Sequence, residues 1–214
     1  MERVRVLGEE LPYARWLLLK LRDRRTDPPA FRLYMREAGR LLAIMASREL
    51  EWTKEAVTTP LGVQAEELEL ASQPLLVGIL GAALPLLEGF SDVYPQARVG
   101  LVAARRVEER DGVRVELYYR RLPRVHGGVA VVVDPMLATG KTVDRVINEV
   151  KSLGSGKVIV GSVIASRQGL AYITSRHPDV TVYTLAVDPE LNASFFIVPG
   201  LGDAGDRGLG VTPG

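Results

Sequence analysis

The chain has 214 residues, of which 47% are hydrophobic and 25% are charged, and these proportions indicate a globular domain with an appended arm rather than a disordered or fibrous protein. Its 27 basic and 26 acidic residues leave a net charge of +1, so any anion site must be local, and we expect binding neither to nucleic acid nor to a membrane. Cysteine is absent and histidine occurs twice, which excludes disulfides, thiolate metal sites, a cysteine nucleophile and a histidine-rich metal cluster.

The first 70 residues predict two helices and a polar segment. The N-terminus lacks the apolar core of a signal peptide, so we expect a cytoplasmic protein. A short amphipathic helix is predicted over 13–25, and Pro28 and Pro29 open a longer one. Its apolar residues recur every three or four positions as one stripe: Phe31, Met35, Ala38, Leu42 and Met45. Between residues 51 and 70 we expect a strand at 56–59 and irregular structure after it.

From Leu75 onward, strands alternate with helices. Five β-branched runs predict strands: 75–80, 97–104, 129–134, 157–165 and 180–188. Helical patterns lie between them: 81–90, 141–153 and 168–176. At least three of the runs are continuously apolar, as in strands covered on both faces. The alternation predicts an α/β fold with a twisted, mostly parallel sheet flanked by helices.

The dipeptide Asp111-Gly112 between extended segments is a strong hairpin signal. We expect a hairpin over 105–122 that projects from the sheet, either as an oligomer arm or as a lid. The whole chain, 1–214, is then expected to be one domain. Its parts would be an N-terminal helical arm or hood (1–70), a parallel-sheet core that carries this hairpin (71–190) and a C-terminal segment (191–214).

The segment VAVVVDPMLATGKT, residues 129–142, is the most informative in the chain. A buried strand ends in Asp134, a loop of small residues follows, and a helix starts near Gly140. Backbone N–H groups of residues 138–142 can converge there on a phosphate, which the helix dipole also favours. The loop adds two hydroxyl donors and a candidate charge partner: Thr139, Thr142 and Lys141.

Asp134 would lie about one sugar length from that phosphate, where a carboxylate can accept charge-assisted hydrogen bonds from two vicinal ribose hydroxyls. Two other interpretations compete. A Walker A loop also ends in Gly-Lys-Thr, but it needs a glycine five residues before Gly140, where Pro135 stands. An ordinary strand–turn–helix without a ligand is the other alternative.

VVVDPMLATGKT resembles the phosphoribosyl pyrophosphate (PRPP) signature of type I phosphoribosyltransferases. The proline after a single acid resembles the uracil phosphoribosyltransferase branch, and FFIVPGLGDAGDRGLG (195–210) is similar to the uracil-binding segment of that branch. Looser similarity runs from Ala30 to Val211. The resemblance implies these PRPP-binding residues: Gly81, Arg106, Asp134, Pro135, Met136, Leu137, Ala138, Thr139, Gly140, Lys141 and Thr142.

The C-terminal segment has a physical interpretation beside the resemblance. Uracil presents an acceptor, a donor and an acceptor along one edge, which a main chain can read with N–H, C=O and N–H groups. Such close approach needs small residues, here Gly200, Gly202 and Gly205. The resemblance implies that Ile197 and Ala204 donate N–H groups, that Gly202 supplies the carbonyl, and that Asp203 organises the base and PRPP. Cytosine would leave buried groups unpaired.

Several positions depart from the family pattern. Gly81 stands where the diphosphate-binding loop of the family carries an arginine, so it offers an N–H group but no guanidinium. Arg106 matches a second family arginine that reaches the diphosphate, with Arg105 beside it; the alternative is a solvated charge on an arm. Phe196 stands where many relatives carry tyrosine, and Lys141 replaces a common glycine.

Three other features receive no chemistry. Residues 165–169 (ASRQG) depart from the family pattern and are assigned no role. His177 is expected at the surface at a helix end, and His126 in a loop.

The resemblance implies a uracil phosphoribosyltransferase that converts PRPP and uracil to UMP and diphosphate in pyrimidine salvage. Its catalytic residues would be Asp134, Asp203 and Arg106, and its Mg²⁺ would be bridged by PRPP and water rather than held by protein ligands. The resemblance also implies a homodimer or homotetramer and regulation by GTP or CTP. Two alternatives stay open: a catalytically weak or regulatory nucleotide-binding protein, because Gly81 replaces the arginine, and a transferase for another base.

Overall fold

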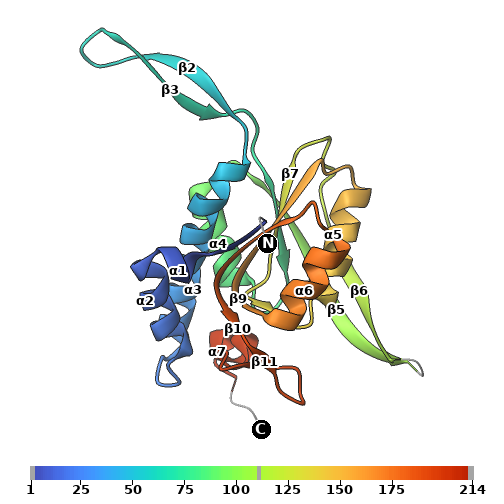
Figure 1. Ribbon diagram of the computed structural model, residues 1–214. Coiled ribbons are helices and arrows are strands. Elements are labelled where there is room, and N and C mark those ends of the chain that lie inside the picture. Colours follow the sequence, from blue (N-terminus) through green and yellow to red (C-terminus); the bar gives the residue numbers. More distant parts are fainter. Residues whose placement is uncertain (1–2, 110–111, 212–214) are drawn as a thin grey trace.

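The computed structural model describes the backbone of residues 3–109 and 112–211 and their side chains, except those of 106–109 and 112–114 (Figure 1). Within these ranges the centre is an eight-stranded sheet of order β1-β10-β9-β7-β4-β5-β6, with β8 paired to β9. Its strands are β1 (Val4–Val6), β4 (Leu75–Ile79), β5 (Arg98–Glu109), β6 (Gly112–Arg121), β7 (Val129–Val133), β8 (Met136–Leu137), β9 (Lys157–Ser166) and β10 (Thr181–Asp188). The pairings are parallel except that of β5 with β6, which confirms the predicted mostly parallel sheet.

Helices cover both faces of this sheet (Figure 1). On one face lie α1 (Leu7–Glu10), α2 (Pro12–Arg22), α3 (Pro28–Ala46) and α4 (Leu84–Val93), and on the other lie α5 (Lys141–Ser152) and α6 (Arg167–Arg176). Along β7, Val131 and Val133 belong to the hydrophobic core on the side of α1–α4. Ala130 and Val132 belong to the core on the side of α5 and α6. Because both sides of the central strands are buried, their sequences are continuously apolar.

The two N-terminal helices match the prediction closely. The helix predicted over 13–25 spans Pro12–Arg22, and Pro28 and Pro29 begin the longer one, α3. The Asp27 side chain caps α3 by accepting the Ala30 N–H at 2.8 Å. All five residues of the apolar stripe are buried. A short 3₁₀ turn, Ser47–Glu49, ends this region.

Two hairpins project from the body (Figure 1). The predicted hairpin is the β5–β6 ladder, which runs from Leu101 opposite Arg121 to Glu109 opposite Gly112; Asp111 of its turn lies outside the described residues. The second hairpin, β2 (Trp52–Thr58) with β3 (Gln64–Leu70), corrects the expectation of irregular structure after residue 59.

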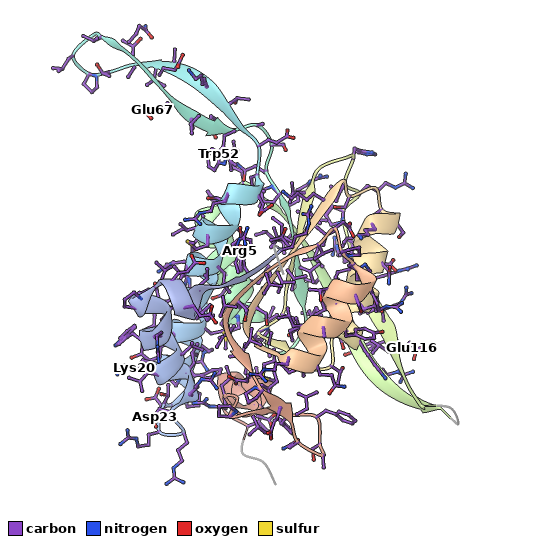
Figure 2. The ribbon with its side chains drawn as sticks, viewed as in Figure 1. Arg5, Lys20, Asp23, Trp52, Glu67 and Glu116 are labelled. Carbon is purple, nitrogen blue, oxygen red and sulfur yellow. The ribbon has the colours of Figure 1, made fainter. Side chains whose placement is uncertain are left out.

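The β2–β3 hairpin left little signal in the sequence because neither of its faces is buried. Its residues are exposed or half-buried along both strands, and Figure 2 shows Glu67 on the projecting part and Trp52 at its base. Without a buried face, no alternation of apolar and polar residues is imposed. Gly62, with a φ of +76°, lies in its turn.

The connections of β4 position the site. The chain continues from β4 to β5 on one side, while β7 pairs on the other side of β4. At such a switch point, the segments after the carboxyl ends of neighbouring strands diverge and leave a crevice. Asp134 directly follows β7, and Gly81 comes two residues after β4, so both predicted loops lie at this edge of the sheet.

The C-terminal segment is folded onto the body. Its elements are β11 (Glu190–Leu191), the antiparallel β12 (Ile197–Val198), and α7 (Ala204–Leu209), which packs against α3. The peptide bond between Val198 and Pro199 is cis. In the part of the chain that the structure describes, no helix is long and apolar enough to cross a membrane.

Candidate active site

A cavity of about 300 Å³ lies between the loop after β7 and the C-terminal segment. The loop side of its lining consists of Asp134, Met136, Leu137, Ala138, Thr139, Gly140, Thr142 and Val143. The C-terminal side consists of Ser194, Phe195, Phe196, Ile197 and Asp203. The two segments that the sequence predicts to bind a sugar phosphate and a pyrimidine therefore share one cavity, although they are far apart along the chain.

The start of α5 forms an anion-binding wall of this cavity. Gly140 is the N-cap residue of α5, and its carbonyl accepts the first helical hydrogen bond, from the Asp144 N–H at 2.8 Å. The N–H groups of Thr142 and Val143 come before that bond and have no acceptor within the helix. These donors and the partial positive charge of the helix end favour a bound phosphate.

Glycine is required at position 140 for two reasons. Its φ is +77°, a left-handed conformation that other residues rarely adopt. A Cβ atom there would also lie 2.9 Å from the Gly169 carbonyl oxygen and 3.0 Å from the Tyr172 ring. The close approach of α6 thus fixes where the α5 N-terminus begins.

One of the predicted phosphate donors is used within the loop. The Ala138 N–H donates to the Met136 carbonyl at 3.0 Å, so Ala138 is removed from the predicted main-chain phosphate donors. The preceding residues hold the loop to the sheet. Met136 and Leu137 pair with β9, and the Pro135 carbonyl accepts two N–H groups of β9 at 3.0 and 3.1 Å.

Residues 165–169, for which the sequence suggests no role, support the loop between β7 and α5. This loop, residues 134–140, is here called the phosphate loop. The Ser166 hydroxyl donates to the Ala138 carbonyl at 2.6 Å and accepts the Gly169 N–H at 2.8 Å, which caps α6. A Cβ atom on Gly169 would lie 2.1 Å from the Ala138 carbonyl oxygen. A serine directly before a helical pattern is a common N-cap signal, and it could have identified this residue.

Asp134 is held at the floor of the cavity. Its N–H donates to the Gly161 carbonyl at 3.2 Å, and its Oδ1 accepts the Met136 N–H over a long 3.4 Å. Burial raises the pKa of Asp134 to about 7, and the Met136 N–H opposes this rise only in part. Hydroxyl groups that donate to this carboxylate would replace the hydration it has lost.

The C-terminal segment has main-chain N–H groups that its own secondary structure does not use. The Asn192 N–H donates to the Phe196 carbonyl at 2.9 Å, so the facing pair Leu191–Ile197 is the non-hydrogen-bonded type of an antiparallel ladder. The N–H of Ile197 therefore points away from β11. Asp203 caps α7 by accepting the Asp206 N–H at 2.9 Å, and the Ala204 N–H in the first turn has no acceptor within the helix.

Some predicted residues lie outside this cavity. Gly81 and Ala204 line a second cavity of about 340 Å³, together with Arg32 and Arg36 of α3. Arg106 lies on β5 opposite Val115, and its side chain is outside the described part of the structure. Pro135, Lys141 and Gly202 are likewise not among the lining residues of the first cavity.

His177 is the last correction. It ends α6 as expected, but it is buried, with 5% of its surface exposed, and its Nε2 lies 2.7 Å from Oδ1 of Asp144. Burial opposes ionisation of Asp144, but hydrogen bonds from Arg176 and His177 outweigh it and hold the pKa of that carboxyl below its usual value. This contact joins α6 to α5. His126 lies exposed in a loop, as predicted.

Acidic side chains at the cavity fit a metal that arrives with a ligand. Among the described residues, no three histidine, aspartate or glutamate side chains gather as a metal centre. Two carboxylates, Asp134 and Asp203, line the cavity. Carboxylate oxygens with water and phosphate oxygens suit Mg²⁺, which usually keeps several waters and binds through one or two carboxylates.

The sequence is similar to known proteins over nearly its whole length. Residues 9–210 match the family model described as uracil phosphoribosyltransferase. The uracil phosphoribosyltransferase of Aeropyrum pernix is 57% identical over 210 residues, which cover 98% of each chain. That of Pyrobaculum arsenaticum is 44% identical over 201 residues, 91% of this chain and 94% of the relative.

Solved structures share the architecture. The AQ2163 protein from Aquifex aeolicus superposes with a TM-score of 0.89 at 32% identity, over 98% of this chain and 99% of that chain. A hypoxanthine phosphoribosyltransferase from Staphylococcus aureus has a TM-score of 0.50 at 8% identity, over 73% of this chain and 74% of that one. The second likeness shows a shared fold alone.

Proposed function

The chain belongs to the uracil phosphoribosyltransferase family, and from this premise we propose that it transfers the 5-phosphoribosyl group of PRPP to N1 of uracil, giving UMP and diphosphate. It is then a pentosyltransferase of pyrimidine salvage. The observation that carries this proposal is the single cavity lined both by the α5 N-terminus with Asp134 and by the C-terminal segment. A reaction between a sugar phosphate and a free base needs two such subsites side by side.

The phosphate loop takes the 5′-phosphate. Donors of residues 139–142 surround the phosphate, and the Thr139 and Thr142 side chains add hydroxyl groups beside the main-chain N–H groups. The Asp134 carboxylate accepts the ribose hydroxyls. Support comes from the lining of the cavity, which includes all three of these side chains.

The C-terminal segment reads the base. Ile197 N–H and Ala204 N–H donate to the two uracil oxygens, and the Gly202 carbonyl accepts N3–H. The orientation of the Ile197 N–H away from β11 supports this role, and so does the position of Ala204 in the first turn of α7. Asp203 lines the cavity and caps α7, which supports a role for this acid beside the base and the sugar.

Catalysis is then mainly positioning and electrostatics. The bond from C1′ to the diphosphate oxygen breaks and C1′ gains oxocarbenium character. Uracil N1 then forms the new bond from the opposite face, and its proton passes to solvent water. Mg²⁺, when bound with PRPP, neutralises charge on the departing diphosphate. Holding both substrates in line supplies about 7–11 kcal/mol in favourable cases. Arg106 and the Gly81 N–H are the proposed diphosphate contacts.

The test is conversion of labelled uracil. UMP should form only when PRPP and Mg²⁺ are both present, and a chelator should stop the reaction. Absence of UMP with a folded protein that binds PRPP would contradict the proposal.

A second candidate, a regulatory nucleotide-binding protein, is favoured by one observation: Gly81 places no guanidinium at the carboxyl end of β4. Tight UMP binding without turnover would support it, and so would a gain of turnover in Gly81→Arg. Space permits this substitution, because a Cβ atom at Gly81 meets nothing within 4 Å, although its φ of +112° strains any side chain.

A transferase for another base remains the third candidate. Competition among uracil, cytosine, orotate and the purines separates it from the first. Preference for uracil supports the proposed pairing with the C-terminal main chain, and preference for any other base contradicts it.

Self-association and an effector complete the proposal. We propose a homodimer or homotetramer, in which the projecting hairpins are the arms; Trp52, Val57 and Leu68 are exposed apolar residues of the β2–β3 hairpin. Sedimentation analysis of the full chain tests this. We also propose that GTP or CTP regulates turnover, which the same uracil assay tests with and without each nucleotide.

A further inference from the structure

A partly buried ion pair joins α2 to the end of β10. Arg22, the last residue of α2, donates to both carboxylate oxygens of Asp188 at 2.6 and 2.8 Å. The Asp188 side chain is 6% exposed and that of Arg22 is 25% exposed. Two parallel hydrogen bonds in one plane give such an arginine–carboxylate pair a defined geometry.

This ion pair also binds both polar groups of the Gly200 main chain. The Gly200 N–H donates to Asp188 Oδ2 at 2.9 Å, and the Gly200 carbonyl accepts from Arg22 Nη1 at 2.7 Å. Gly200 turns with a φ of +62°, and a Cβ atom there would lie 2.0 Å from the Ile197 carbonyl oxygen. The pair therefore fixes the turn that separates Ile197 from Gly202.

A second, half-buried arginine holds the segment on its other side. Arg207 of α7 donates to the carbonyls of Leu21 and Leu201, the latter at 2.7 Å, and its other amino group donates to the Asp23 carbonyl at 2.7 Å. Its guanidinium also lies over the Phe31 ring, 4.3 Å from the centroid.

The contacts of Arg207 fix the α2 end to α7. The last carbonyl groups of a helix receive no hydrogen bond from within the helix. The Arg207 guanidinium donates to those at the end of α2 and so caps that helix. The Asp23 carbonyl accepts a hydrogen bond from Arg207, and Figure 2 shows Asp23 at the end of α2. Turn and helix are thus both tied to one N-terminal helix.

We propose that Arg22, Asp188 and Arg207, here called the C-terminal clamp, are positioning residues that set the geometry of the base-reading main chain and so determine affinity for uracil. None of the three lines the first cavity, so they act through Gly200, Gly202 and Ala204 rather than on substrate. This inference rests on the proposed function of the C-terminal segment.

The clamp makes a prediction that a purely structural role does not. The phosphate loop is held by β9 and Ser166 and has no contact with the clamp among the hydrogen bonds and ion pairs described above. Loss of the clamp should therefore weaken recognition of the base while recognition of the sugar phosphate stays intact.

Calorimetry with two ligands tests this directly. Ribose 5-phosphate occupies the phosphate loop alone, whereas UMP occupies both subsites. Arg22→Lys keeps the charge but cannot make the three fork-shaped hydrogen bonds. We expect it to weaken UMP binding about tenfold and to change ribose 5-phosphate binding less than about twofold. Arg207→Lys and the isosteric Asp188→Asn should do the same.

Lys157→Met is the matched control. Lys157 forms an ion pair with Glu49 at 2.5 Å and donates to the Glu49 carbonyl at 3.1 Å. Like Arg22, it therefore lies at the end of an element and binds both a carboxylate and a main-chain carbonyl. The pair lies at the start of β9, away from the clamp. Its loss should lower the melting temperature, as loss of the clamp does, but leave the ratio of the two affinities unchanged.

Each outcome is decisive. Equal weakening of UMP and ribose 5-phosphate in the clamp variants, or an unchanged ratio, overturns the clamp while the proposed function stands. If the unaltered protein binds UMP no more tightly than ribose 5-phosphate, the base-reading role fails, and the clamp fails with it. In steady-state assays, a rise in the KM for uracil with an unchanged KM for PRPP supports the clamp.

Discussion

The two sides of the cavity are built in different ways. The phosphate loop continues from β7, and main-chain hydrogen bonds to β9 and one hydroxyl, Ser166, hold it in place. The base-reading segment lies beyond the sheet, and its turn is held by guanidinium groups from α2 and α7. The first side therefore depends on the backbone of neighbouring strands, and the second depends on single side chains brought together over most of the chain length.

This difference determines how each side responds to substitution. On the phosphate side, an added Cβ atom is harmful because backbone atoms of α6 and of the loop approach closely, as at Gly140 and Gly169. On the base side, removal of a polar side chain is harmful because the segment has few ladder hydrogen bonds of its own: β12 is two residues long. The following substitutions test the two sides separately, beginning with the largest expected effect.

Asp134→Asn should abolish most of the activity without unfolding the protein. The amide places an N–H donor toward hydroxyls that need an acceptor and removes the charge, so kcat/KM for PRPP should fall roughly 10²-fold or more. Stability should not fall at pH 8. The pKa of Asp134 is raised to about 7, so its contribution to stability is present below about pH 4 and is lost as pH rises through 7.

Steady-state rates and thermal melts at pH 8 check both parts. A melting temperature equal to or above that of the unaltered chain, with a large loss of rate, agrees with a ribose-binding acid. An unaffected rate would remove Asp134 from the site, and the phosphate side would then lack its sugar contact.

Gly140→Ala tests whether the start of α5 is set by close backbone approach. Alanine at a φ of +77° is strained, and its Cβ atom would lie 2.9 Å from the Gly169 carbonyl, so α5 must shift. We expect the KM for PRPP to rise about tenfold while UMP and ribose 5-phosphate affinities fall together. Gly62→Ala is the matched control, since Gly62 has a φ of +76° but nothing within 4 Å; it should leave the KM unchanged.

The phosphate side was largely predictable from sequence, and the base side only in part. Strand β7, Asp134 and the α5 start follow each other directly, so local pattern suffices for them. By contrast, Arg22 and Asp188 are 166 positions apart, and no local pattern pairs them. No local pattern shows that His177 is buried, because its partner Asp144 lies 33 positions upstream. The β2–β3 hairpin was not predictable, because neither face is buried and its sequence therefore shows no alternation of apolar and polar residues.

The affinity of the phosphate side for ribose 5-phosphate should depend on pH. The carboxylate form of Asp134 accepts the ribose hydroxyls, and burial raises its pKa to about 7. If that form alone binds, affinity should rise about tenfold between pH 6 and pH 8 and level off above. Calorimetry in buffers of different ionisation enthalpy should also detect proton release near pH 7.

Asp134→Asn is the control for this pH profile. The phosphate of the ligand itself titrates near pH 6, and its contribution survives in the variant. The difference between the two profiles therefore isolates Asp134. Profiles that coincide would mean that this carboxyl group does not meet the sugar.

Ser166→Ala should reduce phosphate affinity by a few-fold. It removes the donor to the Ala138 carbonyl and the N-cap of α6, so stability should fall by about 1 kcal/mol. Ribose 5-phosphate binding should weaken about threefold, with the ratio of UMP to ribose 5-phosphate affinity unchanged. Asp27→Ala removes a comparable cap, on α3, and should lower stability without this loss of affinity. Equal affinities in both variants would show that Ser166 only stabilises the fold.

The smallest expected effect is a gain, at the boundary between the two sides. Phe196 lines the cavity and is 38% exposed. Phe196→Tyr adds a hydroxyl beside the proposed ribose position, and a neutral hydrogen bond of about 0.5–1 kcal/mol corresponds to a twofold to fivefold gain in ribose 5-phosphate affinity. Phe196→Met removes the ring and adds no hydroxyl, so it should give no gain. Since a hydroxyl on residue 196, directly before β12, would connect the base-reading segment to the sugar, clamp variants made in the Phe196→Tyr background should now weaken ribose 5-phosphate binding as well. A gain that persists unchanged in those variants would mean that the hydroxyl reaches the sugar independently of how the segment is held.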